Sequence, residues 1–69
     1  MRMLKPREIQ EMRERLNMTQ EQFAATFHIS PWTLRKWEQG ERTPSGASMV
    51  LLWLLTKIPD QILEALKRK

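Results

Sequence analysis

Side chains that can bind a polyanion gather in one short stretch of the chain, residues 30–40. At helical spacing, Leu34 and Trp37 fall on one side and are expected to pack inward. The wider, outward side then carries an aromatic ring, a hydroxyl, two cations and an amide, from Trp32, Thr33, Arg35, Lys36 and Gln39. These groups can pair with phosphates, base edges and a thymine methyl. The outward side of this stretch is therefore a candidate surface for entering a DNA groove.

Signals at both ends of the stretch mark it as a helix. Ser30 can cap the first free amides, and Pro31 occupies a position where a missing N–H costs nothing. Gly40 can adopt the left-handed conformation that ends a helix. The sequence thus predicts a helix that begins after Ser30 and ends before Gly40.

A second helix is expected just before this one. Thr19 and Gln22 form a capping-box pattern, which predicts a helix over about residues 20–27. Its inward face would be Phe23, Ala24 and Phe27. Residues 28–30 leave room only for a tight turn between the two helices. Together they predict a helix-turn-helix over about residues 19–40, with the later helix in the recognition position.

Three further helices are expected around this motif. The first begins at Lys5-Pro6 and carries the apolar stripe Ile9, Met12 and Leu16. Another runs over about residues 46–57 with Ser45 as its cap, and the last begins at Pro59-Asp60 and carries Ile62, Leu63 and Leu66. No segment shows strand periodicity. The fold class predicted is all-α, with five helices in a single domain over residues 1–69.

The helix over residues 46–57 is unusual because it is apolar nearly all round. Its predicted core side is Val50, Leu51, Leu54 and Leu55, while Met49, Leu52 and Trp53 are expected to point elsewhere. A helix that is apolar on two sides in so small a protein implies a second buried contact. We therefore expect a homodimer, with the C-terminal helices, residues 45–68, contributing to it. Its predicted interface comprises Met49, Leu52, Trp53, Ile58, Ile62 and Leu66.

Composition limits the classes of partner and location. Twelve Lys plus Arg against eight Asp plus Glu give a formal net charge of +4, which suits a polyanionic partner. The chain has no cysteine and one histidine, so neither a disulfide scaffold nor a metal site is expected. Its longest apolar run, residues 49–55, is far shorter than the ~20 residues that span a bilayer. The expected location is the cytoplasm, without membrane contact.

Several separated elements together resemble a known family. Thr19-Gln20, Phe23-Ala24, Ile29-Ser30, Trp37-Glu38-Gln39-Gly40 and Arg42-x-Pro44 are similar to the helix-turn-helix of the Cro/C1-type (XRE) repressors, over roughly residues 9–55. The continuation Leu51-Leu52-x-Leu54-Leu55-x-Lys57-x-Pro59 is similar to the DNA-binding part of HigA- and MqsA-type antitoxins. The resemblance implies a five-helix, lambda-repressor-like domain.

The resemblance also implies roles for particular residues. Base contacts are expected from Pro31, Trp32, Thr33 and Lys36. Contacts with the DNA backbone are expected from Thr19, Gln20, Ser30, Arg35, Gln39, Arg42, Thr43 and Ser45. Arg13 and Glu38 match a structural ion pair that joins two helices.

Two positions depart from the family pattern. His28 stands where glycine is usual, so a left-handed or strained backbone is expected there. Trp32 stands where a polar base reader is common, and an indole cannot pair bidentately with adenine. The family's usual sequence preference therefore does not carry over to this position.

The function this predicts is sequence-specific binding of double-stranded DNA at a palindromic operator, as an autoregulating transcriptional repressor and the antitoxin of a toxin–antitoxin pair. A phage or plasmid repressor without a toxin partner, and a mainly protein-binding antitoxin module, are the alternatives. An enzyme is the least supported class, because no nucleophile is clustered with a base and no glycine-rich phosphate loop is present. No cofactor is implied.

Overall fold

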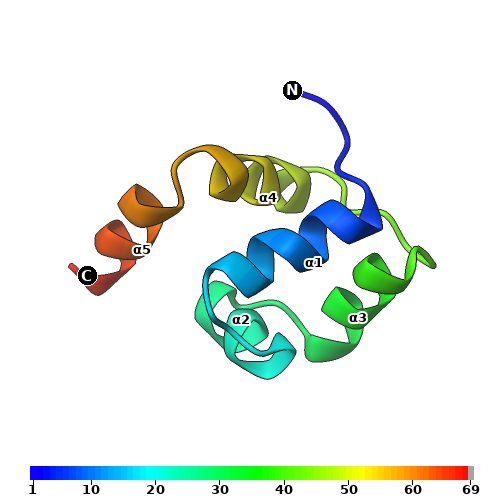
Figure 1. Cartoon of the computed structure of the whole chain (residues 1–69), viewed down its shortest axis with the longest axis horizontal. Coiled ribbons are helices and arrows are strands. Elements are labelled where there is room, and N and C mark those ends of the chain that lie inside the picture. Colours follow the sequence, from blue (N-terminus) through cyan, green and yellow to red (C-terminus); the bar gives the residue numbers. More distant parts are fainter. Residues whose placement is uncertain (69) are drawn as a thin grey trace.

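A computed structural model describes residues 1–68, which form five helices and no strand. The helices are α1 (Pro6–Arg15), α2 (Gln20–Phe27), α3 (Pro31–Gln39), α4 (Ala47–Lys57) and α5 (Pro59–Lys67). Figure 1 shows α1 running through the middle of the bundle, with α2 and α3 on one side of it and α4 on the other. The predicted all-α class, the five helices and the helix-turn-helix of α2 and α3 are confirmed.

The start and end of α2 follow from local chemistry. The Thr19 hydroxyl accepts a hydrogen bond from the Gln22 N–H at 3.1 Å, and the Thr19 N–H donates to the Gln22 side-chain oxygen at 2.9 Å. This is the predicted capping box. The helix ends at His28, whose backbone is left-handed with φ 58°. The left-handed backbone that was expected at this position, where glycine is usual, is therefore present. It turns the chain sharply into α3.

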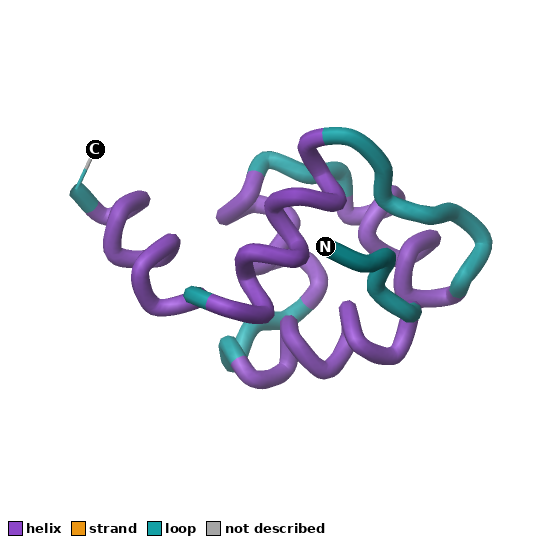
Figure 2. Tube along the Cα trace, turned by 90° about the horizontal axis from the view of Figure 1, so that it is seen from above, coloured by secondary structure: helices purple, strands orange, loops and turns teal. Residues whose placement is uncertain are grey.

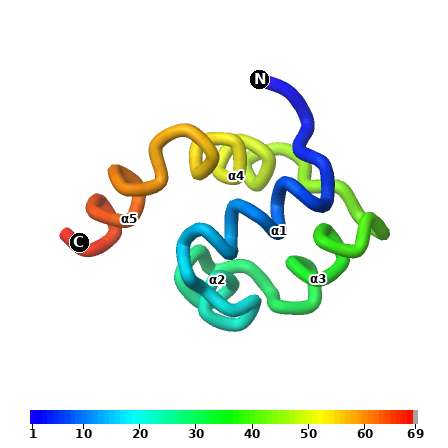
Figure 3. The backbone as a smooth tube through the Cα atoms, viewed as in Figure 1, coloured from blue at the N-terminus to red at the C-terminus, as the bar shows by residue number. Residues whose placement is uncertain are grey.

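The C-terminal end of α3 is closed by a Schellman motif. Gly40 adopts φ 79°, its N–H donates to the Trp37 carbonyl at 3.2 Å, and the Glu41 N–H donates to the Lys36 carbonyl at 3.0 Å. A Cβ added to Gly40 would lie 3.4 Å from Cγ of Pro6, so the turn also packs closely on the start of α1. Figure 3 shows the chain after α3 passing the start of α1 on its way to α4.

One apolar core joins α1 to the helices on both of its sides. Its buried members are Leu4, Ile9, Met12, Phe23, Leu34, Trp37, Leu52 and Leu55. Phe23 and Phe27 add a tilted aromatic pair with ring centroids 4.6 Å apart. Leu4 was not expected, because it precedes the first helix and belongs to no periodic pattern. It ties the N-terminal segment to the core.

Two expectations for α4 are wrong. Ser45 does not cap this helix; Gly46 occupies the N-cap position with φ 57° and no side-chain cap forms. The core side is also different, because Leu52 is 0% exposed and packs inward with Leu55, whereas Val50 is 42% exposed. Leu52 is therefore a core residue and not part of a dimer surface. A helix that is apolar nearly all round has no polar stripe to fix its rotation, so sequence periodicity could not select the correct side.

The last helix, α5, extends from the bundle and has no buried residue. Figure 2 shows it projecting beyond the other four helices, with α4 as its neighbour. Its more sheltered side is formed by Ile62, Leu63 and Leu66, which are only half-buried. Within residues 1–68, the helices are all too short or too polar to cross a membrane.

Candidate nucleic-acid interface

The outward side of α3 is held in place from behind. Leu34 is completely buried and Trp37 nearly so, as their spacing predicted. On the opposite side Pro31 and Gln39 are exposed, and Thr33, Arg35 and Lys36 are half-buried. Trp32 is 45% exposed, which is a large apolar exposure for a core-forming residue type. The structure thus brings the predicted base-reading residues together on one rigid surface.

Trp32 lies between two cations on this surface. The Arg42 guanidinium carbon is 4.8 Å from the indole centroid, and Nζ of Lys36 is 5.4 Å from it. Both distances are within the range of cation–π attraction. The indole therefore contacts one cation from its own helix and one from the loop after α3. We call Trp32, Lys36, Glu41 and Arg42 the indole cluster.

Glu41 is the member of the indole cluster that sequence reasoning missed. Nζ of Lys36 lies 3.3 Å from each of its carboxylate oxygens. The Lys36 side chain is 26% exposed and that of Glu41 is 56% exposed. The signal that could have found this pair is Gly40, because a Schellman turn returns the second residue after the helix to the last turn of that helix. The cation predicted to read a base thus has an acidic neighbour.

The predicted ion pair between α1 and α3 is present and nearly enclosed. Nε of Arg13 donates to Glu38 at 2.7 Å and Nη2 donates at 3.1 Å, while Nη1 donates to the Met18 carbonyl at 2.9 Å. The Arg13 and Glu38 side chains are 11% and 6% exposed. The hydrogen bond to Glu38 raises the pKa of Arg13 above its ordinary value, so Arg13 stays charged. This pair sets the position of α3 against α1.

Gln20 joins the same network, which the sequence did not indicate. Its side-chain amide donates to a Glu38 oxygen at 3.0 Å, so the first residue of α2 is tied directly to α3. This arrangement places the N-terminal end of α2, with its free backbone amides, beside the outward surface of α3. Such an end attracts phosphate through its N–H groups and dipole. Contact between Gln20 and DNA remains a prediction. The backbone N–H of Gln20 is as available for this contact as its side chain.

The other predicted backbone contacts lie at the N-caps of α2 and α3 and in the loop after α3. Thr19 and Ser30 are exposed, although each hydroxyl already accepts a capping hydrogen bond. Arg42, Thr43 and Ser45 are exposed in the loop that follows α3. The start of α2 is bonded to α3 through Gln20, and this loop is bonded to α3 through the N–H groups of Glu41 and Arg42. Both segments therefore lie beside α3, where they could contact the DNA backbone.

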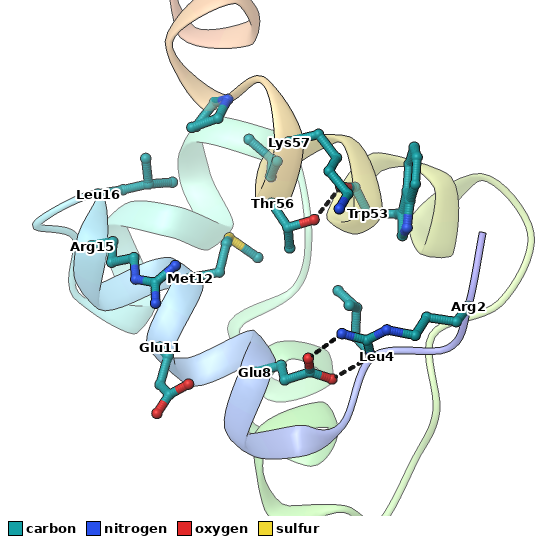
Figure 4. Close-up of a pocket in the computed structure, with 12 residues that line it drawn as sticks. Arg2, Leu4, Glu8, Glu11, Met12, Arg15, Leu16, Trp53, Thr56 and Lys57 are labelled. Atoms are coloured by element: carbon teal, nitrogen blue, oxygen red, sulfur yellow. Dashed lines mark hydrogen bonds and ion pairs between the residues drawn. The ribbon is translucent and has the colours of Figure 1, made fainter.

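A groove of about 240 Å³ lies elsewhere, between α1, the end of α4 and the N-terminal segment. Figure 4 shows Trp53 and Lys57 on one side of it and the Arg2–Glu8 ion pair on the other. The hydrogen bond from Arg2 lowers the pKa of Glu8 to about 2. Residues of α2 and α3 do not line this groove, so it is separate from the surface around α3. Among residues 1–68 no cluster of acidic or histidine side chains could hold a metal ion.

Comparison with known proteins identifies this arrangement. A helix-turn-helix family model matches residues 9–52, well over half of the chain. The chain belongs to the Cro/C1-type (XRE) helix-turn-helix family. The matched residues run from Ile9 in α1 to Leu52 in α4, so they include the complete α2–turn–α3 unit and the helices that support it. The family match supports DNA binding through α2 and α3.

Two curated proteins are similar to this XRE chain. Antitoxin HigA-2 of Vibrio cholerae is 39% identical over 59 residues, which is 86% of this chain and 57% of that protein. The type II methyltransferase M.SsoII of Shigella sonnei is 48% identical over 44 residues, or 59% of this chain but only 12% of the enzyme. The chain thus spans about half of the first relative and a small part of the second. The methyltransferase similarity covers only the helix-turn-helix region.

Proposed function

We propose that this XRE protein is a sequence-specific repressor of transcription that binds a palindromic operator in its own promoter. The observation that carries the proposal is the outward side of α3, where Trp32, Thr33 and Lys36 are presented on a helix anchored by Leu34 and Trp37. A short helix with exposed donors and an apolar ring fits the width of the major groove. The formal net charge of +4 supports attraction to the duplex.

Selection of bound fragments from a random duplex library, at two salt concentrations, tests sequence specificity. The expected result is an enriched two-fold symmetric motif that survives the higher salt. Phosphate contacts alone would give binding that falls steeply with salt and enriches no motif. Binding of that second kind would contradict the repressor and leave the basic face as a nonspecific anchor.

Two substitutions separate base reading from backbone contact. Lys36→Ala should weaken binding to the selected motif by about 1–3 kcal/mol and relax the preference at one base pair. Arg42→Ala should instead weaken all duplexes by a similar factor and reduce the salt slope by about one. Titrations by fluorescence anisotropy on the selected and a scrambled duplex measure both. An equal loss on the two duplexes for Lys36→Ala would remove it from the base readers.

We infer that the repressor acts as a homodimer through the apolar surface of α4 and α5. Supporting this, Ile58 is 40% exposed, and Met49, Trp53, Ile62 and Leu66 are only partly covered. A two-fold dimer would hold two α3 helices about 34 Å apart, one turn of DNA. Leu52 is excluded from this surface because it is buried in the core.

Light scattering at micromolar concentration tests the dimer. The wild-type mass should be twice that of the chain. Leu66→Glu should give the monomer mass, because it places a charge on the apolar side of α5. Gln61→Glu is the matched control, since Gln61 is exposed beside Asp60 and Glu64 on the polar side of the same helix. A wild-type monomer, with and without DNA, would refute the proposal.

The similarity to a HigA-2 antitoxin supports a second role, in which the chain also sequesters a toxin. The same apolar surface of α4 and α5 is available to a sister subunit or to a toxin. Copurification of the untagged neighbouring gene product with the tagged protein tests this role. A stable complex would establish an antitoxin; its absence, with operator binding intact, would favour a phage or plasmid repressor without a toxin.

A further inference from the structure

We propose that Glu41 determines how well this protein distinguishes its operator from other DNA, by holding Lys36 away from phosphates. The inference rests on the proposed repressor function. It assigns a role to an acidic residue that neither the sequence pattern nor the family similarity singles out. Its basis is the position of Glu41 within the indole cluster, on the surface that faces DNA.

Backbone geometry fixes Glu41 beside Lys36. The Lys36 carbonyl accepts the N–H of Glu41 at 3.0 Å and that of Arg42 at 3.3 Å, so the chain after Gly40 is bound to the last turn of α3. The Glu41 carboxylate then meets Nζ of Lys36 with both oxygens at 3.3 Å. Because these are main-chain restraints, they hold the backbone of Glu41 beside Lys36 whether or not Lys36 is charged.

The second neighbour of Lys36 restricts its freedom further. Its ammonium group lies 5.4 Å from the Trp32 centroid, and the Arg42 guanidinium occupies the same indole at 4.8 Å. Lys36 is therefore flanked by a ring and a carboxylate, and its side chain is only 26% exposed. Arg42, by contrast, is exposed in the loop. Of the two cations on the indole, Lys36 is the one neutralised by an acid.

This difference has a consequence for binding. On a random duplex a free ammonium would take any phosphate within reach, which strengthens binding without reading sequence. With Glu41 in place, Lys36 already has an anionic partner and gains little by exchanging it for a phosphate. On the operator a guanine edge offers two acceptors in the groove, and the ammonium of Lys36 has three N–H donors, so it reaches them while it stays bonded to Glu41. Glu41 thus suppresses nonspecific affinity more than specific affinity.

A simpler effect of Glu41 must be separated from this one. Any surface carboxylate close to DNA repels phosphates, and its removal strengthens binding to every duplex alike. Glu21 supplies the matched control, because it is an exposed acid in the first turn of α2, at the other edge of the α3 surface. It forms no hydrogen bond or ion pair with Lys36. Glu21→Gln removes the same charge without releasing a cation.

The experiment measures dissociation constants of wild type, Glu41→Gln and Glu21→Gln on two duplexes of equal length, the selected operator and a scrambled sequence. For Glu41→Gln we expect scrambled-duplex affinity to rise by about three- to tenfold, with an operator gain below about twofold. The three- to tenfold range for the scrambled duplex combines two effects. Loss of an exposed ion pair shifts an equilibrium by up to about fivefold, and loss of one repelling charge accounts for the rest. For Glu21→Gln both duplexes should gain by the same factor.

Repeating the Glu41→Gln substitution in a Lys36→Met protein tests whether the effect of Glu41 passes through Lys36. Lys36→Met keeps an apolar chain over the Trp32 ring and removes the charge. In Lys36→Met, adding Glu41→Gln should strengthen binding to both duplexes equally, because no cation is left to release. The salt slope on scrambled DNA should also steepen by about one in Glu41→Gln alone and not in the double variant. Thermal unfolding of each variant verifies that the fold is retained.

The outcomes distinguish the two proposals. Equal gains on both duplexes for Glu41→Gln, with a wild type that prefers the operator, would overturn the role of Glu41 and leave the repressor intact. A selective gain that persists in the Lys36→Met background would overturn it too, because the effect would not pass through Lys36. A wild type without preference for any duplex would overturn the repressor itself and, with it, the role of Glu41.

Discussion

The ion pair between Arg13 and Glu38 offers the sharpest test of what holds α3 in position. Glu38→Ala removes a carboxylate that accepts three hydrogen bonds, two from Arg13 and one from Gln20. Breaking a buried pair by removing one partner costs about 3–5 kcal/mol, because a charge is left without compensation. Arg13 is 11% exposed and keeps its bond to the Met18 carbonyl, so we place the loss at the lower end, about 3 kcal/mol.

Such a loss is large for a chain of 69 residues. At about 0.05–0.15 kcal/mol per residue, the whole domain is stable by roughly 3.5–10 kcal/mol. The melting temperature should therefore fall by about 12–24 °C, at about 4–8 °C per kcal/mol. Urea and thermal unfolding, followed by circular dichroism and tryptophan fluorescence, measure the change.

Two further variants distinguish the cost of leaving Arg13 without its partner from the cost of losing an ion pair. Glu41→Ala, in a solvent-exposed ion pair, should change the free energy of unfolding by less than about 1 kcal/mol. Replacing both partners, as Arg13→Met with Glu38→Leu, should recover most of the stability, because no uncompensated charge remains. A Glu38→Ala protein within about 1 kcal/mol of wild type would refute this account of how α3 is held.

The left-handed backbone at His28 and the Arg2–Glu8 ion pair lead to two more predictions. His28→Gly should stabilise the domain by about 0.5–1 kcal/mol, because the backbone strain that it relieves exceeds the chain entropy that glycine adds to the unfolded state. Asn17→Gly, at φ 59°, should change the stability little, because asparagine tolerates the left-handed conformation. Chemical denaturation compares the two, and equal effects would contradict the reasoning. The pKa of Glu8 is lowered to about 2 from an ordinary value of 4.5, chiefly by the hydrogen bond from Arg2. The contribution of this pair to folding stability is therefore complete above pH 4.5 and is lost as the pH falls toward 2. Carboxyl NMR should show the low midpoint in wild type and a clearly higher midpoint in Arg2→Ala, which stays below 4.5 because the Lys5 N–H still donates to Glu8 at 2.8 Å. An unchanged midpoint in that variant would exclude Arg2 as the cause.

Local signals were sufficient to predict most of the fold. The capping box at Thr19, the cap at Ser30 and the terminating Gly40 each depend on a few neighbouring residues, and all three form as expected. Leu34 and Trp37 were placed correctly because α3 has a clear polar side that fixes its rotation. The expected bond between Arg13 and Glu38 is also present.

The errors arose where information is not local. In α4 the apolar residues encircle the helix, so only its packing in the fold, where α1 is a neighbour, determines that Leu52 is buried. Leu4 joins the core from a segment without periodicity. Gln20 makes its contact through the relative placement of two helices, and Glu41 makes its contact through the turn at Gly40, so neither follows from the apolar periodicity of a helix. The outward surface of α3 and the Arg13–Glu38 pair were therefore predictable, and the contacts of Gln20 and Glu41 were not.

The lack of any buried residue in α5 gives this helix a use as a reporter of assembly. A helix of nine residues is marginally stable alone in water, and α5 has little tertiary packing to compensate. Its amide protons should exchange with solvent far faster than those of α3. Exchange in α3 requires global unfolding, because the buried Leu34 anchors that helix in the core. A sister subunit covering α5 would slow this exchange as protein concentration rises, whereas a toxin would slow it only when added. Hydrogen exchange at this one helix can therefore identify what covers it.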